Sequence, residues 1–147
     1  MAPSPKVLAV RLHLPDVDQA FPEFFAALET LQISLSKHLE MDDIRPQLRT
    51  VATLALGIFR REDEAMELTR DRMMLPHRTA HQRFIRSLAG FQKALEEDGP
   101  SVAISQDYRR DIVDWIFEHH LLMDAALGRH VQAVVERSLD RISRSDT

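Results

Sequence analysis

The stretch Met73–Ile85, MMLPHRTAHQRFI, combines a helix start with two histidines on one helical face. Pro76 suits the first position of a helix, and the apolar spacing after it predicts a helix over about 76–97. His77 and His81 are four residues apart, which places their rings one above the other on that helix. The same face continues into apolar residues, so two imidazoles stand where aliphatic side chains are expected.

The rest of the chain extends this helical pattern. It has only four glycines, and its apolar residues recur at helical rather than alternating spacing. We therefore predict an all-α fold, an up-down-up-down antiparallel four-helix bundle with an extended N-terminal arm and a short C-terminal helix. The four expected helices cover about 19–38, 42–69, 76–97 and 105–127, and a short amphipathic piece covers 131–142. One domain over 1–147 follows, with the arm at 1–15, the bundle at about 16–127, and the C-terminal helix and tail at 128–147.

Several residues are expected to begin or end these helices. Small polar side chains cap helix N-termini, proline is tolerated in the first turn, and glycine often stops a helix. The residues assigned these roles are Asp18 as a cap with Pro22 in the first turn, Asp42 or Asp43 as a cap, Ser105 as a helix start, and Gly128 as a stop or kink.

Composition excludes several classes of function. The chain has no cysteine, which removes disulfides, iron–sulfur ligation and thiol catalysis. Its net charge is -4, with 19 basic and 23 acidic residues spread along the chain. The sequence contains no basic stripe of the kind that binds nucleic acid. No apolar run is long enough for a membrane span or a signal peptide. We therefore expect a cytoplasmic protein without nucleic-acid or membrane partners.

Ionisable residues fall on rows that should face the core. Glu62 lies one turn after Ile58 and one turn before Met66, on an otherwise apolar row. His119 and Asp124 belong to the last long helix. Five α-helical residues turn through about 500°, so these two side chains should diverge by about 140° and share one ion less readily than a pair four residues apart.

Burial of such groups without partners costs several kcal/mol, and two explanations stay open at this point. One is ordinary: a histidine on a helix is usually exposed or hydrogen-bonded, and the run RREDEAM around Glu62 is typical of a solvated face. We give this ordinary interpretation to His13, His38, His120 and His130. The other is a metal site in the bundle core, built from side chains that project inward from several helices.

Three motifs resemble those of hemerythrins, more closely the bacterial single-domain form. They are IFRREDEAM at Ile58–Met66, HRTAHQRF at His77–Phe84 and WIFEHHLLMD at Trp115–Asp124. Their order and separations match that family, and the resemblance covers the chain from about Asp16 to Leu127. It implies a hemerythrin-like four-helix bundle.

The resemblance also implies a set of metal ligands. Hemerythrins hold two irons that are bridged by one Glu and one Asp; three histidines bind one iron and two bind the other. His77, His81 and His119 match the three-histidine iron. Glu62 and Asp124 match the bridging carboxylates. If all five bind one metal, at most one coordination position stays open.

The remaining two histidines of the family are replaced here. Their positions hold Ala20 and Ile58, so the iron that binds O2 in the family has lost both of its own ligands. Glu23, one turn after Ala20, is the nearby substitute we can name. Ile58 places hydrocarbon where an imidazole would point, so a two-iron site is disfavoured.

The expected function is therefore an altered, mononuclear version of the family site. Iron is the expected metal, one per chain rather than two, and Zn or Mn also suit the ligand types. We expect sensing of O2, NO or redox state, or metal binding, rather than reversible O2 transport, which uses both irons of the family. We do not expect an enzyme, because a non-heme iron oxygenase needs more open positions than five ligands leave.

Two alternatives remain. One is a metal-free bundle that acts as a regulatory or protein-interaction module, and the other is a di-iron O2-binding protein with substitute ligands. The expected partners are a metal ion and a diatomic gas, and no protein partner can be named.

Overall fold

The computed structural model describes residues 2–145, and every regular element in that range is helical. The first four helices are α1 (Pro5–Ala9), α2 (Pro15–Ser36), α3 (Met41–Leu68) and α4 (Met74–Asp98). The remaining elements form one continuous rod: α5 (Val102–Tyr108), α6 (Trp115–His119) and α7 (Ala125–Ser145), joined by π-helical turns at Arg109–Asp114 and His120–Asp124. The predicted all-helical fold is confirmed.

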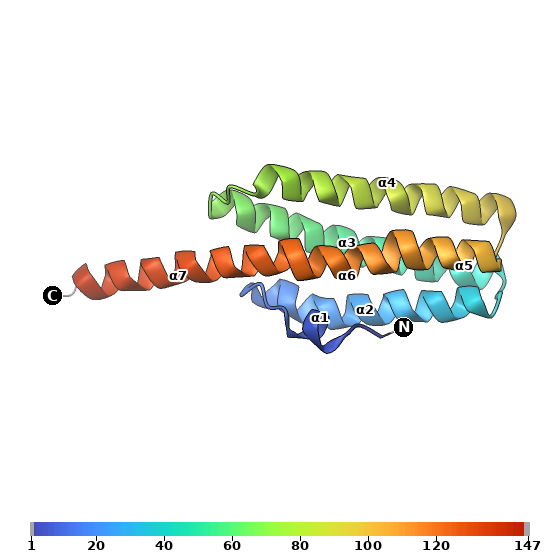
Figure 1. Cartoon of the computed structure of the whole chain (residues 1–147), viewed down its shortest axis with the longest axis horizontal. Helices are drawn as coiled ribbons and strands as arrows, with labels where there is room; N and C mark the ends of the chain where they lie inside the picture. The colour runs from blue at the N-terminus through green and yellow to red at the C-terminus, as the bar shows by residue number, and fades with distance from the viewer. Residues whose placement is uncertain (1, 146–147) are drawn as a thin grey trace.

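The long helices lie side by side, and the second half of α7 projects beyond the others (Figure 1). α2 packs against α3, α3 against α4, and α5 against both α2 and α4. Apolar rows that recur at helical spacing face inward, as the periodicity predicted. The largest fully buried side chains include Tyr108, Phe24, Phe84, Leu28 and Met66. Tyr108 also ties α5 to α2, because its hydroxyl donates to the carbonyl oxygen of Leu28 at 2.8 Å.

Two helix starts, those of α2 and α5, differ from the sequence expectation. α2 begins at Pro15 rather than after Asp18, whose carboxylate instead accepts a hydrogen bond from the Leu12 backbone N–H at 2.8 Å. Pro22 therefore lies inside α2 and not in its first turn. α5 begins earlier than Ser105, because the Ser101 hydroxyl accepts a hydrogen bond from the Ile104 N–H and caps the helix there.

Two further helix boundaries were predicted wrongly. Asp42 and Asp43 lie in the first turn of α3, and Glu40 precedes the helix. Pro76 is the third residue of α4 rather than its first, since α4 begins at Met74. In both cases the acidic or proline residue still occupies the first turn, where it is compatible with free N–H groups.

The two ends of the chain also correct the sequence expectation. The N-terminal arm is not wholly extended, because Ser4 caps the short helix α1. Gly128 does not stop a helix; α7 runs through it, so the C-terminal helix is a continuation of the rod and not a separate short element. A Cβ at Gly128 would collide with the backbone carbonyl oxygen of Arg11. Glycine at this position therefore allows the arm to pack directly on α7.

No helix within residues 2–145 is both long and apolar enough to cross a membrane.

Candidate metal centre

The structure brings together all five residues that the sequence proposed as ligands. Glu62 comes from α3, His77 and His81 from α4, His119 from α6, and Asp124 from the second π-helical turn. One ligand atom from each lies within 4.8 Å of the others. All five side chains are buried, with exposed fractions of 5% or less. The ordinary interpretation of Glu62 as a solvated charge is therefore wrong.

A π-helical turn explains how His119 and Asp124 meet. In a regular α-helix, side chains five residues apart diverge, and we expected these two to do so. The turn at His120–Asp124 has the wider i→i+5 hydrogen-bonding pattern, which brings residues five apart back toward one face. Nε2 of His119 accordingly lies 3.1 Å from Oδ1 of Asp124. The expected divergence is thus removed by a local change in helix geometry.

Most of the separations between donor atoms match those around a single ion. Two ligands at right angles, each about 2.1 Å from a metal, lie about 3.0 Å apart, and a tetrahedral pair lies about 3.4 Å apart. Nε2 of His77 is 3.2 Å from Nε2 of His119 and 3.1 Å from Oδ1 of Asp124. Nε2 of His81 is 3.0 Å from Oε1 of Glu62, whereas Nε2 of His77 is 3.8 Å from the same oxygen.

Three buried atoms in this cluster lack hydrogen-bond partners. Both carboxylate oxygens of Glu62 and Nε2 of His81 make no hydrogen bond to any described residue, although two of these atoms are only 3.0 Å apart. Unpaired buried polar atoms are rare in folded proteins and usually indicate a missing ligand or a functional strain. The donor set, neutral nitrogen with carboxylate oxygen, fits a divalent transition metal.

Burial and mutual contact shift the pKa values of the cluster. Burial, followed by the negative charge of Asp124, raises the pKa of Glu62 well above its usual value. Burial alone would raise the pKa of Asp124, but hydrogen bonds with His119, His120 and His77 outweigh it and hold that pKa well below its usual value. Burial, with the neighbouring histidines, lowers the pKa of His81 to about 2. His81 is therefore neutral, which is the form of imidazole that binds metals.

Two further residues orient the cluster, and the sequence analysis missed both. Nδ1 of His81 donates to Oδ1 of Asp63 at 3.0 Å, which fixes the tautomer whose Nε2 faces Glu62. His120, interpreted from the sequence as an ordinary histidine, is 1% exposed, and its Nδ1 lies 2.8 Å from Oδ2 of Asp124. The available signals were the Glu-Asp neighbours at 62 and 63 and the i, i+4 spacing of His120 and Asp124.

Aromatic rings hold the imidazoles in place. The ring of Phe59 stacks on His81 with centroids 4.0 Å apart, and Trp115 stacks on His119 at 4.9 Å. The ring of Phe21 lies 4.1 Å from that of His120. Such packing restricts the rotation of each imidazole, so the donor atoms are positioned before any ion arrives.

The two positions at which the sequence resemblance expects further histidines hold apolar side chains. Ile58 is 2% exposed one turn before Glu62, and Ala20 is half-buried beside Phe21. Glu23, named from the sequence as a substitute ligand, is exposed and is not part of the cluster. Oδ2 of Asp124 is not free either, because it lies 2.8 Å from Nδ1 of His120.

Small hollows approach the cluster from the surface between α4 and the rod. One of about 240 Å³ reaches His119, and another of about 150 Å³ reaches His77. Leu122 and Met123 line both hollows. A small apolar molecule can therefore reach the outer edge of two of the three imidazoles.

Comparison with protein families, with curated proteins and with solved structures finds no match for this chain.

Proposed function

We propose that this protein is a hemerythrin-like metal-binding protein whose site holds one metal ion, with iron as the physiological metal. The ligands are His77, His81, His119, Glu62 and Asp124. The single observation that supports this proposal best is the convergence of these five buried donors, three of whose atoms have no other partner. A bound iron would supply one-electron redox chemistry and a binding position for O2 or NO. The function is accordingly sensing or metal binding, without reversible O2 transport and without catalysis.

The fold belongs to the same proposal. We place α2, α3, α4 and the α5–α7 rod in an up-down-up-down four-helix bundle, as the short connections between consecutive helices favour. In such a bundle, the ligands come from three adjacent helices near one end of the core. The role of the chain is to keep His81 neutral and to hold the imidazoles buried and oriented through Asp63, Phe59 and Trp115.

The partners of the two Asp124 carboxylate oxygens favour one metal over two. Its Oδ1 faces His77 and His119, and its Oδ2 accepts from His120. The His120 imidazole thus takes the place of a second metal as the partner of that oxygen. Ile58 and the Phe21 ring add hydrocarbon on the same side of the cluster.

Metal content per chain tests the proposal. Protein purified without chelator is analysed for Fe, Zn and Mn, together with its visible spectrum in air. We expect about one metal per chain, lost in His77→Ala and in His81→Ala but kept in the control His130→Gln, which lies outside the cluster and retains a donor for the Thr69 carbonyl. An empty wild-type protein that also fails to take up Fe(II), Zn or Mn would favour the metal-free interaction module. Two irons with an oxo-bridge absorption band would favour the di-iron alternative.

A further inference from the structure

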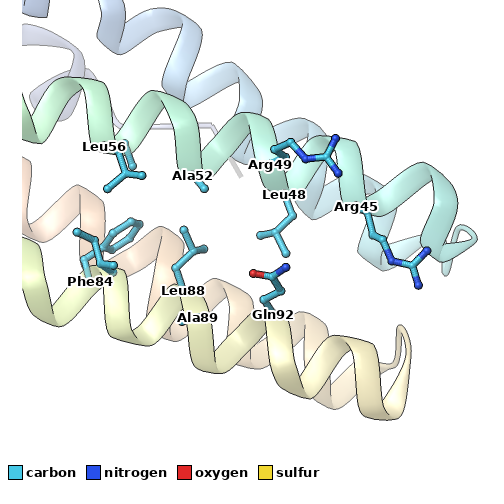
Figure 2. Close-up of a pocket in the computed structure, with 11 residues that line it drawn as sticks. Arg45, Leu48, Arg49, Ala52, Leu56, Phe84, Leu88, Ala89 and Gln92 are labelled. Carbon is cyan, nitrogen blue, oxygen red and sulfur yellow. The ribbon is translucent and has the colours of Figure 1, made fainter.

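A half-open groove of about 290 Å³ runs between α3 and α4, and none of the five cluster residues lines it. Figure 2 shows Leu48, Ala52 and Leu56 of α3 pointing across it toward α4. Phe84 and Leu88 point back from α4 and complete an apolar floor. Its volume is near the lower limit for small-molecule sites.

Apolar surface remains uncovered along this groove. Small side chains at Ala52, Ala55 and Ala89 leave the space between the two helices open. The rims carry Leu56, which is 51% exposed, and Ile85, which is 40% exposed. A concave, mostly apolar surface with a few polar side chains is the usual lining of a small-molecule site.

The polar side chains of the groove gather at one end (Figure 2), and two of the three are cationic. They are Arg45, Arg49 and Gln92, and no acidic residue lines the groove. The guanidinium of Arg45 is neutralised by two hydrogen bonds to Glu96, at 2.7 and 2.9 Å. Within residues 2–145, the structure gives the exposed Arg49 guanidinium no carboxylate partner. Among the described residues, the Arg49 guanidinium is therefore an unpaired cationic donor at one end of the apolar groove.

We propose that this groove binds an aliphatic monocarboxylate of about eight carbons, with its carboxylate at Arg49 and its alkyl chain along Leu48, Leu88 and Phe84. The length of this ligand follows from the geometry of α3. Arg49 and Leu56 are seven residues apart, which is about 10 Å of helix rise and the length of an extended chain of about eight carbons. The volume of the groove agrees with a ligand of this size, because it equals about ten groups of the size of a water molecule. The site is separate from the metal cluster, so the two proposals stand or fall independently.

Binding in the groove should be detectable through the fluorescence of Trp115. Phe84 lines it, and the ring of Phe84 lies 5.2 Å from that of Trp115, the one tryptophan of the chain. An alkyl chain against Phe84 therefore changes the environment of the indole. Phe84 also meets Phe59 edge-on at 5.5 Å, and Phe59 stacks on His81. Occupancy is measurable through Trp115 fluorescence in both metal-free and metal-loaded protein.

Titration with octanoate, below its aggregation concentration, tests the proposal. We expect a saturable fluorescence change at one site per chain, with tighter binding than 1-octanol or octylammonium. Hexanoate, which is two methylenes shorter, should bind about 10- to 15-fold more weakly, because each buried methylene contributes about three- to fourfold in affinity. Arg49→Gln should weaken octanoate about fivefold and leave 1-octanol unchanged. The matched control Arg137→Gln, on the projecting part of α7, should change neither.

A second variant separates the groove from surface adsorption. Ala89→Leu places a branched side chain at an exposed helical position and should abolish the fluorescence change while leaving the circular dichroism intact. Equal binding of octanoate and 1-octanol, equal binding by Arg49→Gln, or an unchanged response in Ala89→Leu would each overturn the assignment. So would sedimentation data showing that a second copy of the chain covers this face. Metal content is measured on the same samples. An empty metal site with normal octanoate binding would refute the proposed metal-binding function and leave the groove proposal intact.

Discussion

Nδ1 of His120 lies 2.8 Å from Oδ2 of Asp124, so that each oxygen of this buried carboxylate faces a different set of imidazoles. Oδ1 lies 3.1 Å from Nε2 of both His77 and His119. His120 therefore orients the carboxylate without belonging to the predicted ligand set. Its ring cannot turn freely because Phe21 and Phe25 pack against it.

We expect His120→Ala to lower metal affinity about 10- to 100-fold, the usual effect of losing a residue that orients a ligand. His120→Asn should recover most of that loss, because the asparagine amide can donate to Oδ2 from a similar position. Competition with a chromophoric chelator measures both. Equal affinities for the alanine and asparagine variants would mean that His120 acts only by filling space.

Asp63 should support His81 in the same way. We expect Asp63→Ala to lower metal affinity about tenfold, and Asp63→Asn to lower it less, because the amide oxygen still accepts from Nδ1 of His81. The neighbouring Glu64→Gln, an exposed change on the same helix, is the matched control. A loss in the control as large as that in Asp63→Ala would point to the general charge of α3 rather than to the His81 contact.

Chelation should lower thermal stability by mass action. A metal held at 100 times its dissociation constant stabilises the folded chain by about 2.7 kcal/mol. For a chain of this size, that corresponds to a fall in Tm of about 5 to 11 °C after metal removal. Differential scanning calorimetry with and without chelator measures the shift. His77→Gln should show no shift, and a chelator effect that persists in this variant would place the metal elsewhere.

Gly128 offers a test of the contact between the arm and α7. Gly128→Ala should destabilise the protein by about 1 to 3 kcal/mol, because the added Cβ meets the Arg11 carbonyl oxygen and overpacks that contact. Gly57→Ala and Gly90→Ala are matched controls, since a Cβ at either position has no described atom within 4 Å. Both should stabilise their helices by about 0.5 to 1 kcal/mol. Urea unfolding measures all three, and a neutral Gly128→Ala would show that the arm shifts without cost.

Helical periodicity predicted the fold class and placed Glu62, His77, His81 and His119 on rows that face the core, because both depend on local spacing. Asp124 entered the predicted set through the family resemblance, since regular helical spacing argued against it. Glu62, His77 and His81 fall on buried rows at regular α-helical intervals, so the burial of each follows from counting residues. Metal ligation by these residues remains a prediction.

The features that sequence reasoning missed depend on contacts between distant segments. α2 begins at Pro15, earlier than predicted, because the Asp18 carboxylate accepts a hydrogen bond from the Leu12 backbone N–H rather than capping its own helix. Gly128, which resembles a helix stop, continues α7 because a neighbouring backbone lies against it. No propensity scale contains such tertiary contacts.

The π-helical turn at His120–Asp124 makes the centre sensitive to the number of residues in the rod, and not only to their types. A turn of this kind holds more residues than an α-helical turn. If the same residues between His119 and Asp124 formed regular α-helix instead, everything downstream would rotate by about 100° relative to His119. Asp124 and the α7 face that carries Gly128 would turn together, so the extra residue in this turn keeps both the carboxylate beside the histidines and the arm against its helix.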